Sequence, residues 1–134
     1  MATNIFINLP VKDLSKSIEF FTSLGYTFNP QFTDEHAACM VISDTIYAML
    51  LTHSRFKDFI KKEIADSKKT TEVLIALSAE SKEKVNELVN KAIAAGAHEA
   101  MDAQDHGFMY SRSFEDPDNH IWEILWMDPN FVQK

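Results

Sequence analysis

The same order of strand and helix patterns occurs twice along the chain, and this repetition limits the folds that it can adopt. The first half shows a strand pattern, a helix pattern and three further strand patterns, at 4–11, 14–24, 26–32, 38–43 and 46–52. The second half has the same five patterns at 72–78, 82–95, 98–103, 108–114 and 121–127. Apolar residues at helical spacing define each helix, and Gly25 and Gly96 end them. The order predicts an α+β fold with two tandem βαβββ modules.

The length of 134 residues suits one compact domain, 1–134. Within it, we place the two modules at roughly 1–53 and 70–128. The segment between them has apolar residues at helical spacing, Phe56, Phe59, Ile60 and Ile64, so we expect a linker helix at 54–66.

Charge and cysteine content exclude several classes of partner. The formal net charge of −7 opposes binding to a nucleic-acid backbone. No apolar run approaches the roughly 20 residues that a membrane span needs, and the N-terminus does not resemble a signal peptide. The single cysteine, Cys39, excludes an internal disulfide. We therefore expect a cytoplasmic protein whose partner is a small molecule.

The closing segment contains one charge that needs an explanation. A turn at Asp116–Asn119 leads into a strand in which Ile121, Glu123 and Leu125 share one face. A buried carboxylate without a partner costs on the order of 2 to 7 kcal/mol. Glu123 is therefore either exposed, paired within the protein or used to bind something.

Two motifs resemble those of the vicinal oxygen chelate superfamily, which includes glyoxalases, bleomycin and fosfomycin resistance proteins and extradiol dioxygenases. Val11–Phe21 resembles the start of its first helix, and Phe114–Glu123 resembles its closing Asp-Pro-Asp-Gly turn and glutamate strand. The resemblance implies that the two modules form a cup-shaped mixed sheet. In the enzymes of this superfamily, the cup holds a divalent metal.

The resemblance places the four metal-ligand positions at Phe6, Met49, Leu74 and Glu123. Only Glu123 is a suitable ligand, since Phe and Leu cannot ligate and a thioether suits these metals poorly. We therefore expect no metal cofactor. The alternative is one divalent ion (Ni, Zn, Mn or Fe) held by relocated ligands, Glu123 with Glu72 and Asn8.

Two further polar side chains are candidates for the cup. Tyr110 and Arg112 alternate along the strand before the closing turn. If their row lines the cup, they suit an anionic or planar ligand. Arg112 could also neutralise Glu123 directly, as a structural ion pair without a ligand. The predicted ligand-binding set is Phe6, Asn8, Met49, Leu74, Tyr110, Arg112 and Glu123, with Glu123 as the catalytic candidate.

These observations lead to four interpretations of function. The first is a homodimeric protein related to glyoxalases and bleomycin resistance proteins that binds a small apolar or aromatic ligand without a conventional metal site. The second is a metal-dependent lyase or isomerase of the lactoylglutathione lyase type with relocated ligands. A dioxygenase would need histidines inside the strands, where none is evident. The fourth is a structural or regulatory dimer with a filled core. Whether the modules pair within a chain or between chains stays open.

Overall fold

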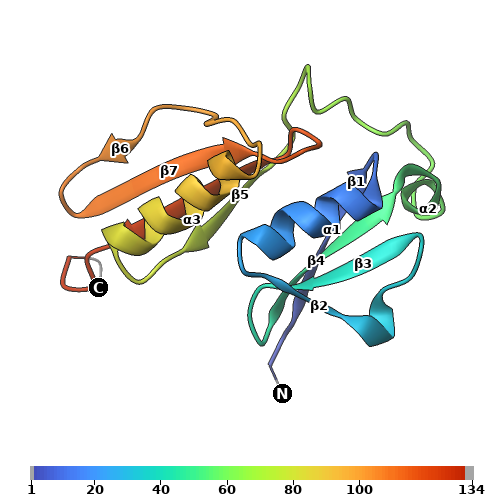
Figure 1. Cartoon of the computed structure of the whole chain (residues 1–134), viewed down its shortest axis with the longest axis horizontal. Coiled ribbons are helices and arrows are strands. Elements are labelled where there is room, and N and C mark those ends of the chain that lie inside the picture. The colour runs from blue at the N-terminus through green and yellow to red at the C-terminus, as the bar shows by residue number, and fades with distance from the viewer. Residues whose placement is uncertain (1, 132–134) are drawn as a thin grey trace. The chain divides into compact units, whose positions relative to one another are not determined.

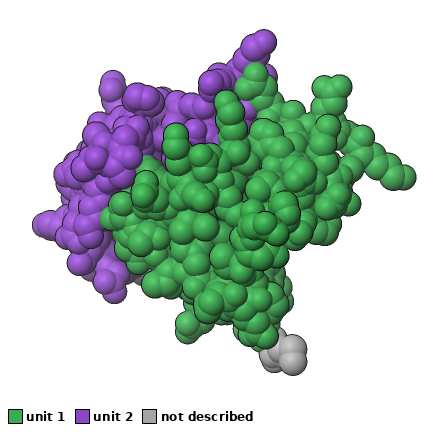
Figure 2. Space-filling model, turned by 45° about the vertical axis from the view of Figure 1, so that its right-hand side comes forward, with its two compact units in different colours: residues 1–66 green, residues 67–134 purple. Residues whose placement is uncertain are grey.

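The computed structural model describes residues 2–131 and shows two compact units, Met1–Asp66 and Ser67–Lys134 (Figure 2). Each unit contains one mixed four-stranded sheet with a helix packed on it (Figure 1). The predicted α+β fold with two βαβββ modules is confirmed. None of the helices in residues 2–131 is long and apolar enough to cross a membrane.

The first unit has its first and last strands side by side. Its elements are β1 (Ile5–Val11), α1 (Leu14–Ser23), β2 (Thr27–Asn29), the 3-10 turn η1 (Pro30–Phe32), β3 (Ala37–Val41), β4 (Ile46–Thr52) and α2 (His53–Lys57). The strands lie in the order β1-β4-β3-β2. β1 runs parallel to β4, and the other neighbours are antiparallel.

Local signals at both ends explain the position of α1. The carboxylate of Asp13 accepts a hydrogen bond from the Lys16 backbone N–H at 3.2 Å, which caps the first turn. Gly25, with φ of 105°, takes the left-handed conformation that follows the helix. The buried side of α1 includes Phe20 and Phe21 and contacts β3 and β4.

The predicted linker helix at 54–66 is wrong in extent, because α2 ends at Lys57. A short helix persists mainly through burial of its apolar side, and Phe59 is instead 71% exposed. Lys57 and Lys61 would also be like charges one helical turn apart. The short α2 contacts β1 and β4, and the helical pattern of the sequence does not continue as helix beyond Lys57.

The second unit repeats the arrangement. Its elements are β5 (Leu74–Ser78), α3 (Lys82–Ala94), β6 (Gln104–Asp105), β7 (Met109–Glu115) and β8 (Ile121–Met127), with the strands ordered β5-β8-β7-β6. β5 is parallel to β8. Ser81 caps α3 by accepting from the Lys84 N–H at 3.1 Å. Val85 and Val89 of α3 are buried on the side that contacts β7 and β8.

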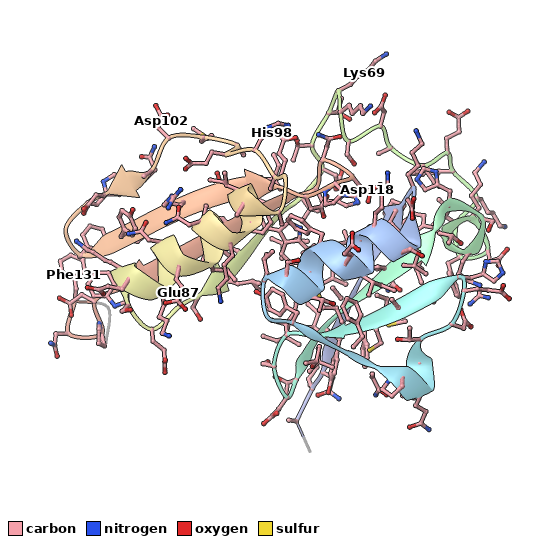
Figure 3. All side chains as sticks on the ribbon, in the orientation of Figure 1. Lys69, Glu87, His98, Asp102, Asp118 and Phe131 are labelled. Carbon is pink, nitrogen blue, oxygen red and sulfur yellow. The ribbon has the colours of Figure 1, made fainter. Side chains whose placement is uncertain are left out.

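The strand predicted at 98–103 is largely replaced by a bend. His98 forms an isolated bridge with Glu115, and the paired strand begins only at Gln104. Met101 is 67% exposed, and Asp102 points away from the sheet (Figure 3). Without apolar side chains that bury on one face, this segment lacks the alternation that stabilises a strand.

The turn before β8 is organised around the buried carboxylate of Asp116. It accepts from the indole N–H of Trp122 at 3.0 Å and from the backbone N–H groups of Asp118 and His120 at 2.8 and 3.0 Å. Burial raises the pKa of the Asp116 carboxyl, and the nearby His120 and these donors oppose that rise. Asn119 has φ of 66°, a conformation that asparagine tolerates better than most residues.

Candidate functional site

Glu123 lies on the face of its sheet opposite α3. Its cross-strand neighbours are Ala76 on β5 and Ser113 on β7. Trp122 and Ile124, which alternate with it, are 1% exposed in the core beneath α3. Within residues 67–131, the half-buried Glu123 carboxylate makes no hydrogen bond or ion pair. Two small neighbours and no internal partner leave this carboxylate free to interact with a ligand.

Apolar surface accompanies Glu123 on this face. Leu74 is 59% exposed and is the cross-strand neighbour of Ile121, two residues before Glu123. Ser111 and Ser113 of β7 lie on the same face, as their registers with Leu125 and Glu123 show, and both are buried. The face therefore combines one carboxylate, small polar groups and an exposed aliphatic side chain.

The first unit has an aromatic surface on the face opposite α1. Phe6 and Asn8 alternate with the buried core residue Leu9, and their neighbours on β4 are Tyr47 and Met49. The Phe6 and Tyr47 rings stack, with centroids 4.9 Å apart and planes at 11°. Phe6 remains 51% exposed.

Internal hydrogen bonds restrict two of these polar groups. The phenol of Tyr47 donates to the Asp44 carbonyl at 2.9 Å. The Asn8 amide donates to the Phe6 carbonyl at 3.3 Å. Tyr47 is therefore held as a fixed support for Phe6, and the side-chain oxygen of Asn8 remains available as an acceptor.

The sheet registers relate the two units to each other. Asn8 pairs with Met49 across parallel strands, as Ala76 pairs with Glu123. Met49 is thus the first-unit counterpart of Glu123. Phe6 and Leu74 are likewise counterparts. Phe6 lies two residues before Asn8, the neighbour of Met49, and Leu74 lies two residues before Ala76, the neighbour of Glu123.

Arg112 does not form the ion pair with Glu123 that the sequence left possible. Arg112 and Tyr110 lie on the α3 side of the sheet, whereas Glu123 faces the other way. Arg112 Nε donates to Glu99 Oε2 at 3.2 Å, and its Nη1 donates to the side-chain oxygens of Asn86 and Asn90, each at 3.0 Å.

Tyr110 belongs to the same network, because its hydroxyl donates to Asn86 at 2.7 Å. Asn86 and Asn90 are one helical turn apart on α3, so they can meet one strand residue together. Both Tyr110 and Arg112 therefore fasten α3 to β7 and do not line the face that carries Glu123.

Glu72 and Glu123, two of the alternative metal ligands, are separated along the direction of β5. Glu72 precedes β5, where the neighbour of Glu123 is Ala76, four residues further on. Four strand residues span roughly 13 Å. Among residues 2–131, no group of three or more His, Cys, Asp and Glu side chains is placed to hold a metal ion.

Sequence reasoning missed two contributors to these faces. Tyr47 is next to Phe6 because β1 pairs in parallel with β4, and these two strands are far apart in the sequence. Ser113 becomes a neighbour of Glu123 through the register of β7 with β8. An estimate of hairpin register across the Asp116–Asn119 turn was the one signal that could have identified Ser113.

Comparison with known proteins agrees with this architecture. A family model described as bleomycin resistance protein-like N-terminal matches residues 3–43. A hypothetical protein from S. aureus is 28% identical, with a TM-score of 0.78 and coverage of 94% of this chain and 95% of that one. No curated protein matches the sequence significantly.

Two more distant structures share the fold. A glyoxalase/bleomycin resistance protein/dioxygenase family enzyme from Burkholderia phytofirmans is 17% identical, with a TM-score of 0.76 and coverage of 94% and 99%. A fosfomycin resistance protein from Mesorhizobium loti is 12% identical, with a TM-score of 0.71 and coverage of 100% and 99%.

The paired βαβββ units give the chain the fold of the glyoxalase/bleomycin resistance/dioxygenase structures. Residues 3–43 in addition match the family described as bleomycin resistance protein-like N-terminal.

Proposed function

We propose that this protein binds small apolar or aromatic molecules, and that in each unit the binding surface is the sheet face opposite the helix. The observation that carries the proposal is the exposure of Phe6 and Leu74, which are 51% and 59% exposed at counterpart positions of the two units. Large apolar side chains presented on a sheet surface gain free energy when a ligand covers them.

The surroundings of Phe6 support an aromatic ligand in particular. Its ring is backed by Tyr47, and Met49 supplies a thioether, which adapts to irregular apolar shapes. A well-placed aromatic contact contributes about 0.5–1.5 kcal/mol beyond the area that it buries. In the second unit, Glu123 offers an acceptor to a hydrogen-bond donor or a positive group of a ligand bound on its own sheet face.

The neutral fluorescent probe N-phenyl-1-naphthylamine tests this function. We expect saturable binding to the wild-type protein and about tenfold weaker binding to Phe6→Ala, equivalent to about 1.4 kcal/mol. Phe59→Ala is the matched control, because Phe59 is an exposed phenylalanine in the linker. Equal probe affinity in the wild type and both variants would contradict the proposal.

A metal-dependent lyase or isomerase is the second candidate, because Glu123 has no partner within its unit. Metal analysis of protein purified without added metal separates the candidates. For the binding protein, we expect EDTA to leave the melting temperature unchanged. A metal present at 100 times its dissociation constant would contribute about 2.7 kcal/mol to stability. Stoichiometric Ni, Zn, Mn or Fe and a large drop in melting temperature would favour the enzyme.

A further inference from the structure

A carboxylate and two aromatic rings form one row across the α3 side of the second sheet. Asp105 on β6 pairs in register with Tyr110 on β7, which pairs in turn with Trp126 on β8. Tyr110 and Trp126 lie in seven-residue strands, and Asp105 lies in the two-residue edge strand β6, so the sheet sets the spacing of the three residues. This row is on the face opposite to that of Glu123.

The side chain of Lys82, the first residue of α3, lies over this row. Its ammonium nitrogen is 5.8 Å from the Tyr110 ring centroid, 5.6 Å from the Trp126 ring centroid and 3.5 Å from Asp105 Oδ2. Both ring distances are within the roughly 6 Å range of a cation–π interaction. One ammonium group thus contacts all three members of the row.

The row is fixed independently of Lys82. The Tyr110 hydroxyl donates to Asn86 at 2.7 Å, which sets the orientation of its ring. The Asp105 carboxylate accepts from the Gly107 backbone N–H at 2.9 Å. This hydrogen bond, together with the nearby Lys82, lowers the pKa of Asp105, so the carboxylate is ionised at neutral pH.

The position of Lys82 on its helix is unfavourable by itself. The N-terminal turn of a helix carries a partial positive charge and favours acidic residues. The contacts of Lys82 with the row offset this unfavourable interaction with the helix. Its side chain is 40% exposed and that of Asp105 is 52% exposed, so solvent reaches the ammonium position.

We propose that the Asp105–Tyr110–Trp126 row is a binding site for the ammonium group of an organic cation, and that Lys82 occupies it as a tethered competitor. A carboxylate beside the faces of two aromatic rings is the chemistry that recognises alkylammonium groups. The flexible stem of Lys82 allows its ammonium group to withdraw into solvent when a ligand replaces it. The site is separate from the ligand face of the proposed function.

Tetramethylammonium chloride tests the site by NMR of the tryptophan indole N–H signals at constant ionic strength. We expect a saturable shift of the Trp126 signal in Lys82→Ala, with affinity at least tenfold higher than in the wild type. The wild type binds more weakly because a tethered group acts at high effective concentration. The Trp122 indole, which donates to Asp116, should not shift and serves as an internal reference.

Two further variants make the test specific. Lys84→Ala removes another α3 lysine, one that pairs with Glu87, and should behave like the wild type. Adding Trp126→Leu to Lys82→Ala should abolish the saturable response. Lys82→Gln provides a second way to vacate the row if Lys82→Ala does not fold. Absence of saturation in both Lys82 variants, or an equal response in Lys84→Ala, would overturn the proposal.

Discussion

Replacing Asp116 with alanine should lower the free energy of unfolding by about 3–5 kcal/mol. The substitution leaves three donors without their acceptor, namely the Trp122 indole and the N–H groups of Asp118 and His120. A fully buried donor left unsatisfied, here the Trp122 indole, costs about 1–3 kcal/mol, and the part-buried N–H groups of Asp118 and His120 each cost less. Removing a desolvated carboxylate offsets part of this loss, but three donors outweigh one acceptor. Urea denaturation at neutral pH measures the change.

Two control variants separate the turn network from a general effect of charge. Asp116→Asn keeps one acceptor oxygen but places an NH₂ group within the network, so we expect a smaller loss of about 1–3 kcal/mol. Asp102→Ala removes an exposed carboxylate in the same unit and should change stability by less than about 0.5 kcal/mol. A loss below about 1 kcal/mol for Asp116→Ala would mean that Asp116 does not organise the turn.

Replacing Arg112 with methionine should destabilise the protein by about 2–3 kcal/mol. The Arg112 side chain is 11% exposed and bridges β7 to Glu99 and to two asparagines of α3. Methionine retains much of the packing of the aliphatic stem, so the loss reports on the hydrogen bonds. Urea melts of the variant provide the measurement.

Double-mutant cycles then identify the partner of Arg112. Arg112→Met with Glu99→Gln should show a coupling energy of about 0.5 kcal/mol or more, because their side chains form an ion pair. Arg112→Met with Glu123→Gln should be additive within about 0.5 kcal/mol, since these residues lie on opposite faces. Strong coupling with Glu123 would contradict the register of β7 and β8.

The elements predicted most accurately are those with local boundary signals. The strand at 46–52 and the strand at 121–127 have the predicted bounds, and Asp13 and Ser81 cap the helices as local capping rules suggest. The helix predicted at 54–66 rested only on the spacing of apolar residues, and the strand predicted at 98–103 rested only on the repeated order of elements. Both predictions failed because these segments do not bury an apolar side. A helical or strand pattern becomes structure only where another element covers its apolar side.

The candidate site could be predicted only in part, for a related reason. Alternation along β7 correctly separates Tyr110 and Arg112 from Ser111 and Ser113. It does not tell which of the two rows faces the helix. The assignment depends on Asn86 and Asn90, whose amides accept from Arg112 across an interval of more than twenty residues. Such a pairing has no signature in the strand itself.

The pairing of the first strand with the last in each unit affects how the chain folds during its synthesis. β1 has its sheet partner only when β4, ending at Thr52, has been synthesised, and β5 must similarly await β8, which ends at Met127. At roughly 5–20 residues per second, each first strand spends seconds outside its sheet. During that interval Phe6 and Leu74 belong to free strand edges, the state in which β-strands aggregate.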